Sequence, residues 1–337
     1  MSMRDHPRAE RVILIFVDGL GLGVPDAEVN PLRHPDLTLL ANYRSSTWSP
    51  PPAGGPPPSM PAVLRDAPLP WGGAVIATDA SLGLPGLPQS ATGQTTLLTG
   101  VNAGSAIGLH LFGFPSAALR QILMRSSILK QVTDAGGTAN FINAFRPRFF
   151  ELGEEVWKRR LSATTWSCRA ADLPFRTLED LLRERAVYQD ITHDSMRARG
   201  FAVDARAPER AGEILATMAR EFDCTLFEFF QTDRAGHAQD RDKAERELGK
   251  LEAFVGSVLA STDLDRTTVI LTSDHGNVED LSVKTHTFNP VPTLVFGPGA
   301  GVITPRLTRL DLFVPLIMRL LERPRPDSAE HGVPGSC

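Results

Sequence analysis

Apolar segments alternate with amphipathic stretches along most of this chain, and the alternation predicts a buried sheet flanked by helices. The run 12–17 (VILIFV) has no polar residue, which is typical of a central parallel strand because helices cover both of its faces. Further strands are predicted at 71–78, 140–142, 225–230, 267–271 and 293–296. The pattern therefore predicts an α/β protein with a mostly parallel central sheet.

Helical periodicity appears between these segments, at 208–222, 243–260 and 310–321. Segment 88–93 is rich in Ser, Thr and Gly, and it leads into the first turns of another predicted helix at 94–99. Backbone N–H groups in front of such a helix have no partner within the helix. They can therefore hold an oxyanion.

The α/β alternation stops in the arginine-rich middle of the chain, where we expect an inserted, smaller α+β cap. The predicted domains are a catalytic core made of 1–107 and 206–325, a cap made of 108–205, and a disordered tail at 326–337. Segment 49–71 is dense in proline, which excludes helix and central strand. We expect an irregular surface loop there, whose role the sequence does not reveal.

The composition is that of an ordinary globular protein, with 337 residues, 42% hydrophobic, and a formal net charge of −4. The near-neutral charge argues against a nucleic-acid binder, which would carry a basic excess. No apolar stretch is long enough to span a bilayer, so we expect a cytoplasmic protein without membrane association. The three cysteines are widely spaced and predict neither a disulfide framework nor a cysteine metal site. The oligomeric state stays open.

Carboxylate and imidazole groups directly follow three of the predicted strands. Asp18 ends the first apolar run, and the segments after 225–230 and 267–271 supply the others. Because the carboxyl ends of parallel strands meet at one edge of a sheet, these groups should lie close together. The candidate metal ligands are Asp18, Asp233, His237, Asp274, His275 and His286.

Mixed oxygen and nitrogen ligands suit Mn²⁺ or Zn²⁺, with Mg²⁺ as an alternative, better than Ca²⁺. Six ligands and one bridging side chain are enough for two divalent ions, which would clamp the attacking and leaving oxygens of a phosphoryl displacement. We predict that Ser90 bridges them and acts as the nucleophile. Taken alone, Asp18-Gly19 reads as a turn and Ser90 as a helix cap. Their joint occurrence with the other strand-end ligands favours metals.

Arginines are frequent between 108 and 205, and most of them are expected on a solvated helical surface. Arg146 and Arg148 flank Pro147 just after the predicted strand 140–142. We predict that these two bind an anionic substrate, because a guanidinium can contact a phosphate through two parallel hydrogen bonds.

Five short segments contain most of the candidate residues: 15–19 (IFVDG), 89–93 (QSATG), 233–237 (DRAGH), 273–277 (SDHGN) and 285–292 (THTFNPVP). Together they resemble the alkaline phosphatase superfamily, and most of all its metalloenzyme branch, which includes cofactor-independent phosphoglycerate mutase and phosphopentomutase. The resemblance covers roughly half of the chain and leaves out the middle. It implies an alkaline phosphatase-like core.

The resemblance also assigns roles to the candidate residues. It implies one metal held by Asp233, His237 and His286, and a second held by Asp18, Asp274, His275 and Ser90. Ser90 would be phosphorylated transiently by a small phosphorylated metabolite. A phosphomutase would return the phosphoryl group to another oxygen of the substrate, whereas a phosphatase would pass it to water.

Two alternatives stay open. Segment 96–100 (TLLTG) resembles phosphodiesterases and phosphonate hydrolases as much as the mutases. A catalytically silent metal-binding module is the other alternative, although unused buried charges are costly and all seven ligand positions are filled. Segment 89–94 (QSATGQ) lacks the Asn-Ser-Glu-Val-Gly-His of the mutases and the Cys/Ser-x-Pro-x-Arg of the sulfatases. Neither phosphoglycerate mutase nor sulfatase activity is therefore predicted.

Overall fold

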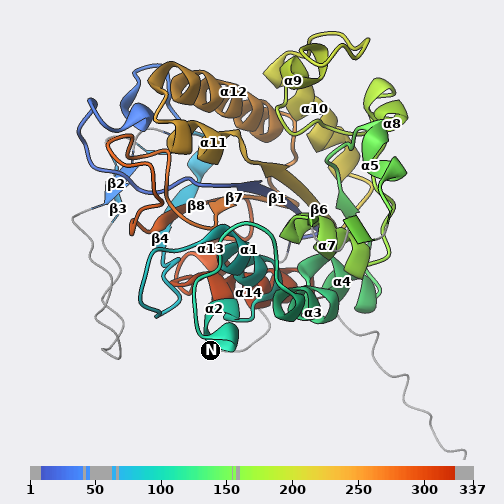
Figure 1. Cartoon of the computed structure of the whole chain (residues 1–337), viewed down its shortest axis with the longest axis horizontal. Coiled ribbons are helices and arrows are strands. Elements are labelled where there is room, and N and C mark those ends of the chain that lie inside the picture. The colour runs from blue at the N-terminus through green and yellow to red at the C-terminus, as the bar shows by residue number, and fades with distance from the viewer. Residues whose placement is uncertain are drawn as a thin grey trace, which may run out of the picture.

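The computed structural model describes residues 9–40, 43–45, 63–65, 68–153, 155–156 and 160–322. Its centre is a six-stranded sheet with the strand order β4-β8-β7-β1-β6-β5, and helices cover both faces (Figure 1). The strands are β1 (Arg11–Val17), β4 (Ala74–Thr78), β5 (Ala139–Phe141), β6 (Cys224–Phe229), β7 (Thr267–Ser273) and β8 (Val291–Phe296). Strands β5, β6, β1 and β7 are parallel, whereas β8 runs antiparallel to both β7 and β4. The predicted mostly parallel α/β sheet is confirmed.

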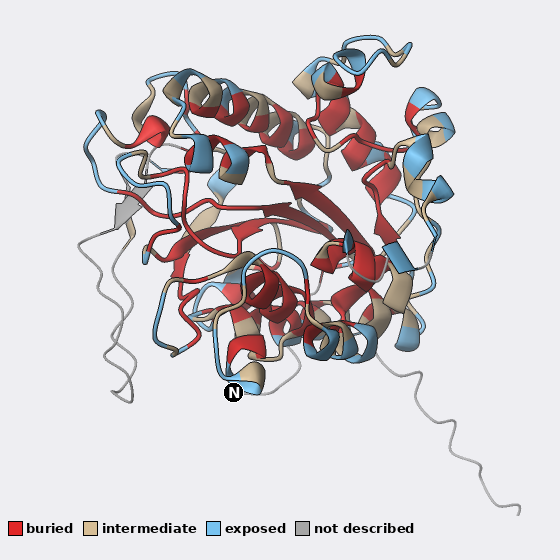
Figure 2. Ribbon diagram, in the orientation of Figure 1, coloured by how far each residue is buried: buried red, intermediate tan, exposed pale blue. Residues whose placement is uncertain are grey.

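Alternate side chains of β1 enter two different cores, because successive residues of a strand point to opposite faces of the sheet. Ile13 and Ile15 pack in a cluster with residues of α10 (Pro208–Ala219) and α12 (Arg241–Ala260). Leu14 and Phe16 pack on the other face with α1 (Ser90–Thr99) and other helices. Both faces of the sheet are therefore buried, as Figure 2 shows.

The helices form a layer on each face. The first face carries α10, α12 and α11 (Gln231–Ala238). The second face carries α1, α2 (Ala103–Ile107), α3 (Ala117–Ser126), α4 (Ile128–Asp134), α7 (Ala163–Ala170), α13 (Ala300–Ile303) and α14 (Phe313–Leu321). Shorter elements are α5 (Pro147–Glu151), α8 (Leu178–Leu182), α9 (Asp194–Arg197), η1 (Pro31–Arg33), η2 (Pro70–Gly72) and η3 (Leu310–Leu312).

Helix α1 begins at Ser90, four residues earlier than predicted. Gln89 is extended and precedes the helix, so residues 90–93 form its first turn instead of a loop in front of it. Two other predicted elements start late: β4 begins at Ala74, after the η2 turn, and the helix predicted at 310–321 begins as the short turn η3. The change at α1 matters most, because it puts the predicted nucleophile at a helix N-terminus.

Part of the predicted cap belongs to the main sheet. Strand β5 pairs with β6 in parallel, and residues of α3, α4 and α7 share the core cluster of Leu14 and Phe16. A separate small cluster in the same region contains Ala144, Leu181 and Tyr188. The region 108–205 is thus joined to the core through a strand and three helices, and its predicted domain boundaries stay a prediction.

Two predicted features fall mainly outside the described residues. Most of the proline-rich segment 49–71 lies there, between the paired strands β2 (Tyr43–Ser45) and β3 (Val63–Arg65). The predicted tail 326–337 lies there entirely. Within the described ranges, no helix combines the length and the apolar character that crossing a membrane requires.

Candidate metal centre

The ends of two neighbouring strands build a first cluster of polar side chains. Strands β1 and β7 are paired with Val17 opposite Ser273, so the residues that follow, Asp18 and Asp274, reach the same edge of the sheet. His275 joins them, with its Nε2 3.3 Å from Asp18 Oδ1 and 3.4 Å from Asp274 Oδ2. These three ligand candidates are buried. Sheet register therefore brings two carboxylates and one imidazole together.

Ser90 lies against this cluster at the start of α1. Its Oγ is 3.0 Å from His275 Nε2. One turn further along the helix, Gln94 donates a hydrogen bond from Nε2 to Asp18 Oδ2 at 3.1 Å. The serine hydroxyl is thus held beside the carboxylates, at the positive end of the helix dipole.

The first turn of α1 packs closely on its surroundings. A Cβ on Gly93 would lie 2.8 Å from the carbonyl oxygen of Asp274, so a larger residue would push the helix away from the cluster. On another side, Thr92 and Leu111 exchange hydrogen bonds, with Leu111 N donating to Thr92 Oγ1 at 3.2 Å. The position of Ser90 is therefore set by both the sheet edge and the loop that follows α2.

A second cluster contains Asp233, His237 and His286. Asp233 and His237 are four residues apart on α11, so they lie on one face of the helix. Their facing atoms, Asp233 Oδ1 and His237 Nε2, are 3.4 Å apart. His286 Nε2 is 3.2 Å from His237 Nε2 and 3.6 Å from Asp233 Oδ1. One ligand atom from each of the three residues therefore lies within 4.8 Å of the other two.

The two clusters adjoin each other. The ring of His275 from the first stacks on the ring of His286 from the second, with centroids 3.6 Å apart and an interplanar angle of 15°. Three strand ends and the N-terminal turns of two helices thus converge on a single small region.

The donor atoms of the second cluster fit a divalent cation. Nδ1 of His237 and Nδ1 of His286 each lie within 2.8 Å of a backbone carbonyl oxygen, of Lys284 and Pro88 respectively. A carbonyl can only accept, so each Nδ1 carries the proton and each neutral ring turns its Nε2 lone pair to the other ring. Two lone pairs and the carboxylate of Asp233 facing one another repel, unless a cation lies between them.

The first cluster fits a cation as well. Within the described residues, Asp18 Oδ1 and Asp274 Oδ2 are buried and lack a hydrogen-bond donor. Burial costs a carboxylate several kcal/mol unless its charge is compensated. A set of two carboxylates, one imidazole and one hydroxyl is a ligand set that Mn²⁺ or Zn²⁺ accepts.

The pKa values of the ligand candidates also reflect buried charges that lack compensation. Burial, reinforced by the negative charge of Asp274, raises the pKa of Asp18 to about 8. Burial opposes the charging of His275, but the carboxylates of Asp274 and Asp18 outweigh it and raise the pKa of His275 to about 10. Burial and the charge on His275 lower the pKa of His286 to about 4. Without a cation the carboxylates therefore draw protons to the site.

Glu279 ties together the loops that carry the ligands. This fully buried carboxylate accepts hydrogen bonds from Gly21 N at 2.9 Å, Asn277 N at 2.7 Å and Asn289 Nδ2 at 3.1 Å, and also from Thr287 Oγ1. The donors come from the loop after β1 and from two parts of the β7–β8 connection, one next to Asp274 and His275 and one next to His286. The sequence analysis did not identify Glu279, because its contact with Gly21 is formed only by the fold.

Asn277 is a second supporting residue that the sequence analysis missed as a single side chain, although its motif was noted. Its Nδ2 donates to Asp233 Oδ1 at 2.7 Å. This contact joins the loop after β7, which carries Asp274 and His275, to helix α11 of the second cluster. The carboxylate of Asp233 is thereby oriented by a neighbour, as is typical of ligating carboxylates.

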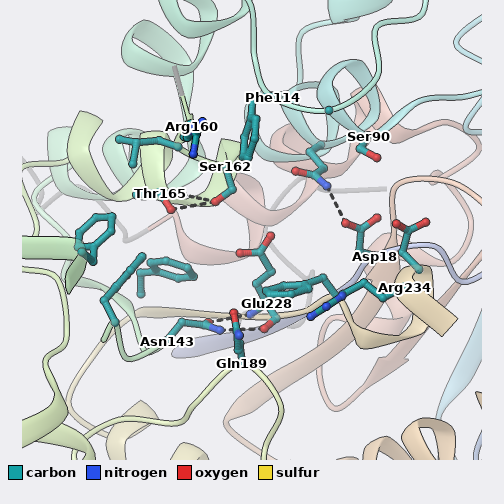
Figure 3. Close-up of a pocket in the computed structure, with 18 of the residues that line it drawn as sticks. Asp18, Ser90, Phe114, Asn143, Arg160, Ser162, Thr165, Gln189, Glu228 and Arg234 are labelled. Carbon is teal, nitrogen blue, oxygen red and sulfur yellow. Dashed lines mark hydrogen bonds between the residues drawn. The ribbon is translucent and has the colours of Figure 1, made fainter. Parts of the chain in front are cut away.

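A pocket of about 560 Å³ opens beside Ser90 and Asp18. Figure 3 shows Ser90 and Asp18 on one side of it and Arg160 on the other. Arg146 also lines it, as predicted, but Arg148 lines only a neighbouring cavity of about 480 Å³. Arg146 precedes helix α5, whereas Arg148 lies within it and is carried round by the first helical turn.

Three further residues of this pocket were not singled out from the sequence. Arg160 and Arg234 add positive charge, and Arg234 directly follows the ligand candidate Asp233, which is the one signal that could have found it. Glu228 on β6 points into the pocket (Figure 3). Burial raises the pKa of Glu228 to about 7, although Thr164 Oγ1 donates to its Oε2 at 2.6 Å.

The structure thus brings the predicted ligand residues together in two adjoining groups of three. Ser90, the first residue of α1, contacts the first group. Their roles as metal ligands stay a prediction. Of the two predicted substrate-binding arginines, one lines the pocket and one does not.

Known proteins share features with this chain. Residues 189–319 match the family model described as the Metalloenzyme superfamily, a region that holds Asp233, His237, Asp274, His275 and His286. The 2,3-bisphosphoglycerate-independent phosphoglycerate mutase of Dinoroseobacter shibae is 29% identical over 128 residues. That alignment covers 36% of this chain and 25% of the mutase, so the chain matches only about a quarter of the length of its curated relative.

Two solved structures resemble the fold over nearly its whole length. The PH0037 protein from Pyrococcus horikoshii has a TM-score of 0.54 and 14% identity, covering 96% of this chain and 100% of its own. The alkaline phosphatase from the Antarctic bacterium TAB5 has a TM-score of 0.50 and 13% identity, covering 93% and 98%. At such identities these two comparisons support the fold alone.

Proposed function

Since this chain belongs to the metalloenzyme branch of the alkaline phosphatase superfamily, a superfamily of metal-dependent phosphoryl transferases, we propose that it transfers the phosphoryl group of a small phosphorylated substrate through Ser90. The observation that carries the proposal is the position of the Ser90 hydroxyl. It lies 3.0 Å from His275 Nε2, in a buried cluster with two carboxylates and beside a second group of three ligand candidates.

The proposed cofactors are two divalent cations, Mn²⁺ or Zn²⁺. Asp18, Asp274, His275 and Ser90 would hold one of them, and Asp233, His237 and His286 the other. When bound, such a pair neutralises the charge of the phosphoryl oxygens and lowers the pKa of a coordinated hydroxyl. Glu279 and Asn277 would hold the ligand loops in place during this chemistry.

The chain's own groups then carry the reaction in two steps. In the first, Ser90 Oγ loses its proton and forms a bond to phosphorus, while the bond between phosphorus and the alcohol oxygen of the substrate breaks and that oxygen takes up a proton. In the second, an acceptor hydroxyl loses its proton and its oxygen forms a bond to phosphorus, while the bond between phosphorus and Ser90 Oγ breaks and Ser90 Oγ takes up a proton. Backbone N–H groups at the start of α1 that have no partner within the helix would stabilise the charge that develops on the phosphoryl oxygens.

The acceptor in the second step separates a phosphatase from a phosphomutase. Water accepts the group in the first case, and another oxygen of the bound substrate accepts it in the second. Arg146 and Arg234 at the pocket would retain an anionic substrate long enough for either outcome.

The experiment that tests the proposal compares p-nitrophenyl phosphate hydrolysis by the Mn²⁺-loaded and Zn²⁺-loaded protein with that of Ser90→Ala. The loss of a nucleophile should lower kcat by about a thousandfold or more. The matched control is Ser105→Ala, which removes a hydroxyl from the exposed side of α2 and should leave kcat unchanged. Mass spectrometry after an acid quench should find the phosphoryl group on Ser90. Equal rates for Ser90→Ala and the unaltered protein would reject this nucleophile.

A further inference from the structure

Two cavities meet at a pair of arginines. The pocket of about 560 Å³ contains Ser90 and Asp18, whereas the adjoining cavity of about 480 Å³ contains neither. Arg146 and Arg160 line both cavities. They therefore lie at the end of the pocket away from the ligand clusters, and Figure 3 shows Arg160 across the pocket from Ser90.

Neither arginine has an acidic partner in the described part of the chain. The recorded ion pairs there involve other cations, and the carboxylates of the pocket belong to Asp18, Asp233 and Glu228. The first two of these carboxylates are ligand candidates, and Glu228 is bonded to Thr164. Two arginines that line the same two cavities without a counter-charge can bind an anion there.

Phenylalanine rings line the pocket at the same boundary as the two arginines. Phe145 and Phe149 line both cavities, with ring centroids 4.2 Å apart. Phe145 is in turn held edge-on by Phe141 at 6.1 Å and by Phe175 at 5.2 Å. The rings are thus fixed by one another, and they present apolar surface to whatever connects the two ends.

We infer that the substrate is a phosphate ester with a second anionic group, a carboxylate or a phosphate, separated from the reacting phosphoryl group by a flat apolar segment. The reacting group would lie at Ser90, the apolar segment against Phe145 and Phe149, and the second anion between Arg146 and Arg160. The inference rests on the proposed function for its orientation. It goes beyond it by assigning these arginines to a part of the substrate that does not react.

The competing assignment is that the arginines bind the reacting phosphoryl group itself. The two assignments differ in what the second anion contributes. If the arginines contact the unreactive end of the substrate, replacing its second anionic group with a neutral group should weaken binding. The same replacement should have no effect in variants that lack the arginines. If they face the reacting end, every phosphate ester should depend on them equally.

The test uses two probes that differ only at the far end, 4-(carboxymethyl)phenyl phosphate and its amide, 4-(carbamoylmethyl)phenyl phosphate. The methylene group keeps the electronic properties of the two phosphate esters similar. Dissociation constants are measured by calorimetry on Mn²⁺-loaded Ser90→Ala protein, which holds the probes without turning them over. We expect the carboxylate probe to bind about tenfold more tightly, as one charge-assisted contact at a partly exposed site allows.

Adding Arg146→Gln or Arg160→Gln to Ser90→Ala should raise the dissociation constant of the carboxylate probe about tenfold. The dissociation constant of the amide probe should change by less than about twofold. Arg125→Gln on the exposed side of α3 is the matched control and should change neither constant. Circular dichroism checks that each variant is folded. Arg160→Lys should keep part of the preference, because it keeps the charge.

Equal affinities of the two probes for Ser90→Ala would overturn the inference, and so would a failure of both probes to bind. An equal weakening of both probes by Arg146→Gln and Arg160→Gln would assign the arginines to the reacting phosphoryl group instead. These outcomes are independent of turnover. A protein that shows the expected preference but never phosphorylates Ser90 would refute the proposed function and not this inference.

Discussion

The two ligand clusters are built by different means. In the first, the register of β1 and β7 delivers Asp18 and Asp274 to one buried edge, with His275 completely enclosed. In the second, helical spacing places His237 near Asp233, and the His237 side chain is 47% exposed. One cluster is part of the sheet and the core, whereas the other is a helix face covered by a loop.

This difference between the two clusters shows what fixes the position of each ligand candidate. Moving a ligand of the first cluster would require moving a strand that pairs on both sides. The imidazoles of the second cluster are oriented by hydrogen bonds to single backbone carbonyls, of Lys284 and Pro88. We therefore expect the first cluster to hold its cation tightly and the second to exchange it with solvent.

The largest effect should come from removing one imidazole from each cluster. His275→Ala should lower kcat by about a thousandfold, and added Mn²⁺ should not restore it, because this imidazole also touches Ser90. His237→Ala should cost about a hundredfold, and excess Mn²⁺ should restore most of it, because two ligands remain in an open site. His34→Ala, outside both clusters, is the control. Equal rescue of both variants would remove the proposed difference between the clusters.

Next in size is the loss of the carboxylate that ties the ligand loops together. Glu279→Ala should lower the free energy of unfolding by about 3 kcal/mol, because it leaves several buried donors without an acceptor. Glu179→Ala on α8 removes a carboxylate that is 70% exposed and should cost less than about 0.5 kcal/mol. Urea denaturation measures both. A loss of similar size in the two variants would mean that Glu279 does not hold the ligand loops.

Glu228 should make the stability of the metal-free protein depend on pH. The pKa of this carboxyl is raised from 4.5 to about 7 in the folded state by burial, so folding favours its protonated form. The stability that protonated Glu228 contributes to the folded state is fully present below pH 4.5 and is lost as the pH rises through 7. Glu228→Gln cannot ionise, so above pH 7 it should be more stable than the unaltered protein by roughly 2 to 3 kcal/mol, with little difference at pH 4.5.

Urea denaturation across this pH range checks the prediction. A gain for Glu228→Gln that is the same at every pH would show that lost packing or hydrogen bonding, and not ionisation, sets the difference. Thr164→Val sharpens the result, because removing the hydroxyl that donates to Glu228 should raise the pKa of the carboxyl further.

The smallest effect should appear during stepwise removal of the metals. Titration of the loaded protein with a chelator should release one cation per chain at about tenfold lower chelator activity than the other. His237→Ala should abolish the weakly held class and leave the strongly held one. Elemental analysis at each step measures the metal content. A single release step in the unaltered protein would show that the clusters hold their cations equally.

The sequence was sufficient for the sheet and for the candidate residues that the fold gathers into two clusters, because both depend on local pattern. An apolar run such as 12–17 indicates a strand that is buried on both faces of the sheet. A polar residue directly after such a strand lies at the edge of the sheet where the strand ends. Glu279 and Glu228 escaped prediction because neither lies in a pattern. The partners of Glu279 include Gly21 from the distant loop after β1. The surroundings of Glu228 include Thr164 of α7, which is also far from it in the chain.

Two differences between the sequence predictions and the structure have local physical causes. Helix α1 was placed late because Gln89 and Ser90 offer no capping hydrogen bond, and Gly93 looks like a turn residue although close packing on Asp274 requires it. Arg146 and Arg148 look equivalent around Pro147. Only the start of α5 between them separates their directions, so the sequence pattern could not tell which one faces the pocket.

The most direct test of the central claim is anomalous diffraction at the manganese edge from crystals grown with Mn²⁺. We predict two peaks per chain about 4 Å apart, one among Asp18, Asp274 and His275 and the other among Asp233, His237 and His286. The first peak should lie next to Ser90 Oγ. No peak at these positions, or peaks bound only by other side chains, would contradict the account.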